Sequence, residues 1–222
     1  MSKSEVKKIK MVDFDAILFD FDGVIANSES LHVSTKKAAL DAFDISYDDE
    51  KITSFQGSPE ANFFNYFADL NKQDANIMLT FKRQLFDKKI DHIEAIDGVI
   101  PFIKKLNIYK PCYIVTSSIR TQMLYFIERH KLEEYFKGHV TCDDVSKHKP
   151  HPEPYLACIV QNKLKANRCL VIEDSPNGVT SAKAAGCFTV GLIGEFSAQN
   201  LLEKGADIVV NTYLELESLI GF

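Results

Sequence analysis

A chain of 222 residues with 45% apolar and 26% charged side chains has the composition of an ordinary globular protein and can bury a core. Its formal net charge of −5 argues against a non-specific nucleic-acid or membrane-surface binder, because such proteins present basic surfaces. The five cysteines are odd in number and never spaced as CxxC, which indicates free thiols in a reducing compartment. No apolar stretch reaches the roughly 20 residues that span a bilayer, so we expect a cytoplasmic protein.

Short apolar runs recur along the chain and predict the strands of one sheet. Helical patterns lie between the later runs, and this alternation indicates a parallel sheet with helices on both faces. The expected fold is therefore α/β with a Rossmann-like core, whose ligands bind outside the carboxyl ends of the strands. The runs are 16–20, 112–116, 139–142, 169–173, 189–193 and, more weakly, 208–211.

The first predicted strand, 16–20, ends within the sequence FDFDGV of residues 19–24. Side chains two apart on a strand point to the same side, so Asp20 and Asp22 are expected to leave the strand end as a carboxylate pair. Two like charges this close are costly unless a cation or a proton lies between them. The pair is therefore a candidate metal and acid/base site.

The interval from 21 to 111 is much longer than the dozen or so residues that a crossover between parallel strands needs. Apolar residues in it recur at helical spacing in two stripes. We expect residues 28–94 to form a small helical cap domain inserted into a catalytic core of residues 1–27 and 95–222. The stripes are Phe63, Phe64, Phe67 and Leu70, and Ile77, Met78, Phe81 and Leu85.

Hydroxyl side chains follow the second predicted strand at Thr116, Ser117 and Ser118. Such hydroxyls, with backbone N–H groups at a helix N-terminus, can hold phosphate oxygens. The alternative is that they only cap the next helix, as Ser and Thr often do, and the pattern by itself favours capping.

A lysine stands between strands at Lys149, in the sequence KPHP, where two prolines stiffen the chain. A lysine on a rigid turn can provide a fixed positive charge for a phosphate. A solvated surface lysine is the alternative, and Lys147 is the local competitor for the role.

A second acidic pair, Glu173 and Asp174, ends the apolar run 169–173. Mg²⁺ takes oxygen ligands, commonly carboxylates, so the pair is a candidate for metal binding. A structural acid that caps the next helix is the alternative, but two acids directly after an apolar strand exceed what capping requires.

In chain order, the DxD pair, the hydroxyl, the lysine and the second acidic pair resemble the four motifs of the haloacid dehalogenase superfamily of phosphotransferases. Residues 22–29 and 172–178 resemble those of its beta-phosphoglucomutase and sugar-phosphatase branch, and the helical insert resembles that superfamily's cap. The resemblance implies a Mg²⁺-dependent phosphatase that hydrolyses a small phosphate ester, such as a sugar phosphate, through an aspartyl-phosphate. It implies neither a nucleic-acid nor a membrane partner, and we expect a monomer or weak dimer.

The resemblance also implies roles for individual residues. Asp20 is the expected nucleophile and Asp22 the general acid and base. Thr116, Ser117 and Lys149 are expected to hold the phosphoryl oxygens. The expected metal ligands are the carboxylate of Asp20, the backbone carbonyl of Asp22, Asp174 and, directly or through water, Glu173.

Relatives in this branch carry a histidine near the active site and a lysine and a glycine loop in the cap, which implies substrate contacts for His32, Lys82 and Gly57. Ordinary helix positions remain the alternative for His32 and Lys82. The mutase carries an arginine three residues after that glycine, to hold a second phosphate, and this chain has Glu60 instead. A carboxylate there would repel a second phosphate, which favours a phosphatase over a phosphomutase.

Other classes of protein also place acids at strand ends. A phospho-accepting regulatory domain gathers acids, a hydroxyl and a lysine there, but it lacks a helical insert. A DxD glycosyltransferase would leave Lys149 and the second acidic pair unexplained. A dehalogenase proper needs no metal and therefore no fourth acidic motif.

Overall fold

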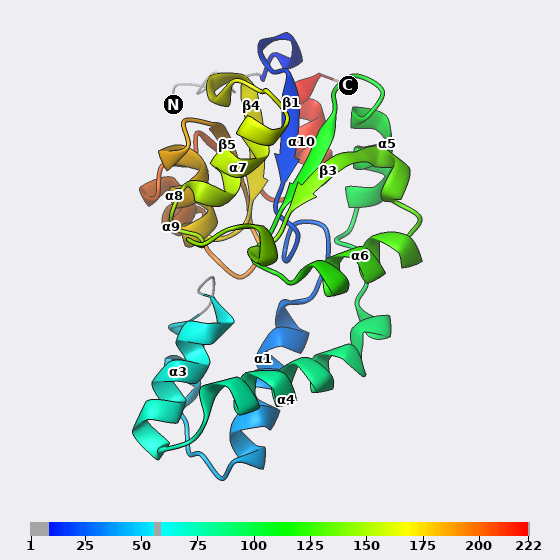
Figure 1. Ribbon diagram of the computed structural model, residues 1–222. Coiled ribbons are helices and arrows are strands. Elements are labelled where there is room, and N and C mark those ends of the chain that lie inside the picture. The colour runs from blue at the N-terminus through cyan, green and yellow to red at the C-terminus, as the bar shows by residue number, and fades with distance from the viewer. Residues whose placement is uncertain (1–8, 56–58, 222) are drawn as a thin grey trace, which may run out of the picture.

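The computed structural model describes residues 9–55 and 59–221, and within them six parallel strands form one sheet (Figure 1). The strand order is β3-β2-β1-β4-β5-β6. The chain builds one side of the sheet from β1 to β3 and then the other from β4 to β6, so the order reverses between β1 and β4. The strands are β1 (Ala16–Phe19), β2 (Cys112–Val115), β3 (Phe136–Val140), β4 (Cys169–Glu173), β5 (Phe188–Leu192) and β6 (Ile208–Val210).

Helices cover both faces of the sheet, because alternate side chains of each strand point to opposite faces. Ile17 and Phe19 pack in the same core as helices α5, α6 and α10, whereas Ala16 and Leu18 pack with α7 and α8. The α/β Rossmann-like prediction is confirmed. The core helices are α5 (Val99–Leu106), α6 (Arg120–Arg129), α7 (Glu153–Gln161), α8 (Pro176–Ala184), α9 (Ala198–Glu203) and α10 (Tyr213–Ile220). Short 3-10 turns are η1 (Met11–Asp13), η2 (Ile90–His92), η3 (Glu133–Tyr135), η4 (Cys142–Asp144) and η5 (Ala166–Arg168).

A separate group of helices lies below the carboxyl edge of the sheet, between β1 and α5 (Figure 1). These helices have an apolar core of their own, in which Phe63, Phe64 and Met78 are fully buried. The predicted inserted helical cap is therefore present. Its helices are α1 (Glu29–Ala42), α2 (Asp49–Thr53), α3 (Glu60–Asn71) and α4 (Ala75–Asp87).

The structure differs from the sequence prediction at the third strand and at the ends of the cap stripes. β3 ends at Val140, earlier than the predicted 142, because it is an edge strand with half-exposed positions and lacks a continuous apolar run. Leu70 and Ile77 are exposed, so the two cap stripes are narrower than predicted.

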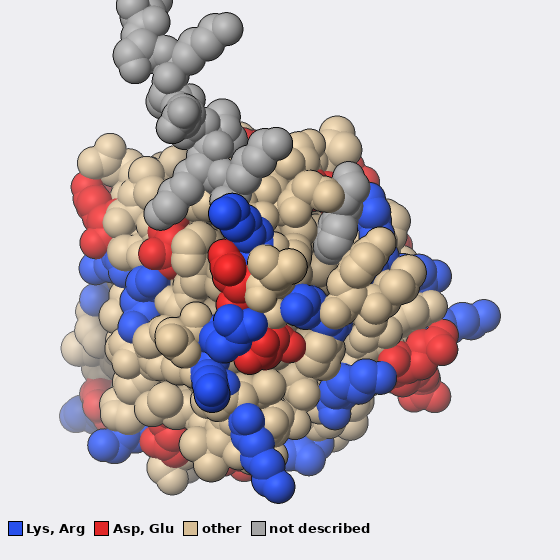
Figure 2. Space-filling view, turned by 90° about the horizontal axis from the view of Figure 1, so that it is seen from above, with Lys and Arg blue, Asp and Glu red and all other residues tan. Residues whose placement is uncertain are grey.

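Charges of both signs are mixed on the face of the core opposite the cap. Figure 2 shows Lys and Arg interspersed with Asp and Glu on the side of the core that points away from the cap. Within residues 9–55 and 59–221, no helix has both the length and the apolar character required to cross a membrane.

Candidate functional site

The sheet brings the ends of three strands together at the point where the strand order reverses. Phe19, the last residue of β1, pairs with Ile114 of β2 and with Ile172 of β4. The Asp20 N–H continues this pattern and donates to the Ile172 carbonyl at 3.0 Å. Asp20 therefore lies between the segments that carry the hydroxyl and second acidic motifs.

Lys149 lies at the centre of this arrangement and is 4% exposed. Its Nζ donates to Asp20 Oδ1 at 2.8 Å, to Glu173 Oε1 at 2.6 Å and to the Val115 carbonyl at 2.9 Å. An ammonium group has three protons, so these bonds use all of them. Burial disfavours the ammonium, but the two carboxylates outweigh burial and raise the pKa of Lys149.

Glu173 is fully buried, and both of its carboxylate oxygens accept hydrogen bonds. Oε1 accepts from Lys149 and from the Tyr155 hydroxyl at 2.8 Å, and Oε2 accepts from the Ser175 hydroxyl at 3.1 Å. A side chain at Gly178 would collide with this carboxylate. Glu173 thus connects Lys149 to α7, through Tyr155, and to the start of α8, through Ser175.

Three carboxylates form the candidate metal centre. One oxygen each of Asp20, Glu173 and Asp174 lies within 4.8 Å of the others, and all three residues are buried. Burial, with the charges of Asp20 and Glu173, raises the pKa of Asp174 well above its usual value. Burial and Glu173 likewise outweigh Lys149 and raise the pKa of Asp20 to about 8.

One ammonium therefore faces three carboxylates, and a further positive charge would relieve their repulsion. The donors are all oxygen, which suits a hard divalent cation such as Mg²⁺. The turn after Asp20 packs tightly against these carboxylates. Gly23 has φ +75°, and a side chain there would run into the Asp174 carboxylate. The donor set fits Mg²⁺.

The Asp22 carboxylate lies outside this cluster and has its own partners. β1 ends at Phe19, so the two aspartates of the DxD pair follow the strand and do not share a strand face as predicted. Asp22 accepts from the hydroxyls of Ser28, at 2.5 Å, and Ser118, and its Oδ1 lies 3.3 Å from His32 Nε2. Burial favours the neutral acid, but His32, Ser118 and Ser28 outweigh burial and lower the pKa of Asp22 to about 2.

His32 connects Asp22 to the cap. Its Nδ1 lies 2.9 Å from Lys82 Nζ and 3.6 Å from Glu60 Oε1, and its ring stacks on Phe86. Lys82, which is 0% exposed, also donates to Glu60. Burial opposes ionisation of Glu60, but His32 and Lys82 outweigh it and lower the pKa of Glu60.

Glu60, which was expected to repel a second phosphate, is closely paired with cations of the cap. Glu60 is paired with Lys82, and its Oε2 lies 3.6 Å from Arg83 Nε. The predicted cap residue Gly57 lies outside the described residues.

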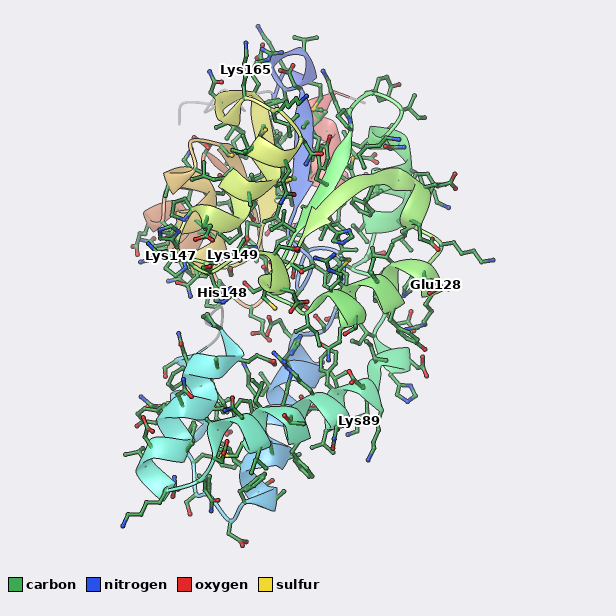
Figure 3. All side chains as sticks on the ribbon, viewed as in Figure 1. Lys89, Glu128, Lys147, His148, Lys149 and Lys165 are labelled. Carbon is green, nitrogen blue, oxygen red and sulfur yellow. The ribbon has the colours of Figure 1, made fainter. Side chains whose placement is uncertain are left out.

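A cavity between the core and the cap joins these groups. Figure 3 labels Lys149 and His148 at the edge of the core that faces the cap. From the core, the cavity is lined by Asp20, Asp22, Ser117, Ser118, Lys149 and Asp174, among others. From the cap, it is lined by Glu29, His32, Lys36, Glu60 and Arg83, among others.

Thr116 is placed differently from Ser117 and Ser118. It is 2% exposed, and its Oγ1 accepts from the Ser118 N–H at 2.9 Å. Thr116 is not among the described residues that line the cavity, whereas Ser117 and Ser118 are. The Thr116 hydroxyl therefore supports the turn that presents the two serines.

The contacts of the Ser28 and Ser118 hydroxyls with Asp22, and of the Tyr155 hydroxyl with Glu173, were not predicted from the sequence. Ser28 had a usable signal, because it lies four residues before His32 and so shares one face of a helical turn with it. No local pattern could pair Ser118 with Asp22 or Tyr155 with Glu173, because 96 residues separate the first pair and 18 separate the second.

Comparison with known proteins gives consistent matches. The family model described as "Haloacid dehalogenase-like hydrolase" matches residues 17–192. Fructose-1-phosphate phosphatase of Escherichia coli is 24% identical over 176 residues, covering 78% of this chain and 93% of that protein. Glycerol-1-phosphate phosphohydrolase 1 of Saccharomyces cerevisiae is 30% identical over 219 residues, covering 90% of this chain and 82% of that protein. The structure titled "Putative beta-phosphoglucomutase from Bacteroides vulgatus" has a TM-score of 0.79 at 26% identity, covering 95% of this chain and 92% of that one.

Proposed function

The chain belongs to the haloacid dehalogenase-like hydrolases, and we propose that it is a Mg²⁺-dependent phosphatase that hydrolyses a small phosphorylated sugar or a related metabolite. It is a hydrolase that acts on phosphate esters, as the printed functions of its curated relatives indicate. The observation that carries the finer proposal is the convergence of Asp20, Glu173 and Asp174 with Lys149, of which all but the buried Glu173 line the cavity.

Asp20 is the proposed nucleophile. Lys149 holds Asp20 Oδ1 at 2.8 Å and thereby orients the carboxylate at the cavity wall. An oxygen of Asp20 attacks phosphorus and forms an aspartyl-phosphate, while the bond from phosphorus to the leaving oxygen breaks. Lys149 holds the carboxylate in place during the attack, and Ser117 lines the cavity where the phosphoryl oxygens would lie.

Asp22 is the proposed general acid and base. It gives a proton to the leaving oxygen in the first step. In the second step it takes a proton from the water that attacks the aspartyl-phosphate, which releases phosphate and restores Asp20. Ser28, Ser118 and His32 keep Asp22 ionised before substrate enters, so its proton has to arrive with substrate or from His32, 3.3 Å away.

Asp20, Asp174 and, directly or through water, Glu173 would hold the metal, together with the backbone of Asp22. Bound Mg²⁺ would supply the positive charge that keeps the acids ionised and offsets the charge of the phosphoryl group. Residues 28–94 would act as a cap that excludes water from the aspartyl-phosphate. The described cysteines are free thiols, which fits the proposed cytoplasmic location.

The test is phosphate release from a panel of sugar phosphates and phosphorylated short acids, with and without Mg²⁺. We expect Mg²⁺-dependent release from at least one of them. No release from any member, or equal release after chelation of metal, would overturn the proposal. Conversion of a sugar monophosphate to its isomer, primed by a sugar bisphosphate, would instead identify a phosphomutase.

A further inference from the structure

Tyr155 is a buried tyrosine that contacts both Glu173 and Lys149. It lies in the first turn of α7, six residues after Lys149 in the chain, and is 0% exposed. Its hydroxyl donates to Glu173 Oε1 at 2.8 Å, and its ring centroid lies 5.0 Å from Lys149 Nζ. Tyr155 is not among the described residues that line the cavity, so any effect it has on the reaction passes through the charged groups that it contacts.

The hydrogen bonds of Glu173 fill its acceptor positions. A carboxylate has about four lone-pair positions. Oε1 accepts from Lys149 and Tyr155, and Oε2 accepts from the Ser175 hydroxyl and, at 3.3 Å, from the Ser175 N–H. Without the phenol hydroxyl, Oε1 would keep Lys149 as its one donor within the described part of the chain. Tyr155 and Lys149 therefore fix the direction of Oε1 together.

The position of Glu173 in turn affects where the Lys149 ammonium lies. Its three protons go to Glu173, to Asp20 and to the Val115 carbonyl. When Oε1 loses the phenol hydroxyl, the buried carboxylate is left with less compensation and attracts Lys149 more strongly. This draws the ammonium away from Asp20 Oδ1, which it holds at 2.8 Å. Attack on phosphorus needs an aligned carboxylate, so a small displacement of this kind lowers the rate.

We propose that Tyr155 is a positioning residue for the reaction: through Glu173, its hydroxyl keeps Lys149 where the ammonium orients Asp20. This rests on the proposed phosphatase function and adds to it a group that does not itself line the cavity. Hydrogen-bond partners of this outer kind, when removed, typically cost about 10–100-fold in activity.

The competing explanation is structural. Tyr155 belongs to the apolar cluster on one face of the sheet that also contains Leu18, Val115 and Val171, and its hydroxyl would then only satisfy a buried acid. Under that explanation, loss of the hydroxyl lowers the thermal unfolding midpoint and leaves kcat of the folded enzyme unchanged. Under the positioning proposal kcat falls as well, while KM stays, because the groups that line the cavity are untouched.

The experiment compares wild type, Tyr155→Phe and the control Tyr213→Phe. Each substitution removes one oxygen from a buried tyrosine and keeps the ring. Tyr213, on α10, is 2% exposed, and its hydroxyl donates to the Val24 carbonyl at 2.8 Å. The two variants therefore lose one buried hydrogen bond of the same length. Both kcat and KM are measured on the best substrate of the sugar phosphate panel, well below each unfolding midpoint.

A second measurement follows Lys149 without any substrate. A buried ammonium group that donates three hydrogen bonds exchanges its protons slowly with water, so it gives a distinct lysine signal in nitrogen NMR. We expect Tyr155→Phe to shift or broaden this signal, because the ammonium moves toward Glu173. Tyr213→Phe should leave it unchanged.

We expect Tyr155→Phe to lower kcat about tenfold or more and to change KM less than about twofold, and Tyr213→Phe to keep both at the wild-type values. An unchanged kcat in Tyr155→Phe, an equal loss in Tyr213→Phe, or an unchanged Lys149 signal overturns the positioning role while the phosphatase proposal stands. A Tyr155→Phe variant that does not fold shows a structural role and overturns it too. Absence of phosphate release by wild type from the whole panel overturns the phosphatase proposal, and the Lys149 signal still decides whether the Tyr155 hydroxyl holds the lysine.

Discussion

The Lys149 ammonium lies 2.8 Å from the Asp20 carboxylate, although 129 residues separate them in the chain. The same ammonium lies 2.6 Å from Glu173, so one lysine balances two buried acids. This relationship makes Lys149 as important for the stability of the site as for any contact with substrate.

Lys149→Met should therefore destabilise the protein. Removing one partner of a buried ion pair leaves uncompensated charge, and we expect the free energy of unfolding to fall by about 3–5 kcal/mol. Urea denaturation measures this. Lys147→Met, at an exposed lysine two residues earlier, is the matched control and should change stability by less than about 0.5 kcal/mol. Equal stabilities of the two variants would contradict the role of Lys149.

Asp20→Asn should fold and lose turnover. The amide keeps the size of the side chain but is a poor nucleophile, so we expect kcat to fall by about a thousandfold or more. Phosphate release measures the loss of turnover, and circular dichroism checks that the variant is folded. Asp15→Asn, which changes an aspartate just before the other end of β1, should keep wild-type activity. Substantial activity in Asp20→Asn would reject Asp20 as the nucleophile.

Metal removal should abolish activity and lower stability together. Chelation with EDTA should stop phosphate release, and Mg²⁺ should restore it and raise the thermal unfolding midpoint, because a ligand that binds only the folded state stabilises it. In Asp174→Asn the donor set loses a charge, so the midpoint should respond to Mg²⁺ far more weakly. A wild-type midpoint that does not change with Mg²⁺ would argue against a metal at these acids.

The contribution of His32 to stability should depend on pH. Burial and the charge of Lys82 oppose protonation of His32, but the nearby carboxylates of Asp22 and Glu60 outweigh them and raise its pKa. A raised pKa means that His32 stabilises the fold fully below its unfolded pKa of about 6.5, and that this contribution is lost as pH rises through the folded pKa.

The stability difference between wild type and His32→Gln should accordingly be larger at pH 6 than at pH 9, as measured by urea denaturation at both values. His92→Gln, at an exposed histidine in η2, provides the comparison. A difference that grows toward pH 9 would show that neutral His32 is the stabilising form.

The fold was largely predictable because its signals are local. The apolar runs at β1, β2 and β4 are continuous, since central strands of a parallel sheet are buried on both faces. β3 was misplaced because an edge strand needs no such run. The long interval before β2 predicted the cap, since no simple crossover requires it.

The residue types of the site were predictable too, because metal and phosphate chemistry needs acids, hydroxyls and a cation at strand ends. Their partners were not. Whether Lys149 meets Asp20, whether Asp22 faces serine hydroxyls, and whether Glu60 is paired all depend on contacts between residues far apart in the chain. Packing of the cap against the core, and of α7 and α8 against the sheet, sets those contacts, and no local pattern records them. By itself the sequence determined which chemical groups the protein carries, and only the tertiary structure decided which charges neutralise one another, because that depends on how the cap and the core pack together.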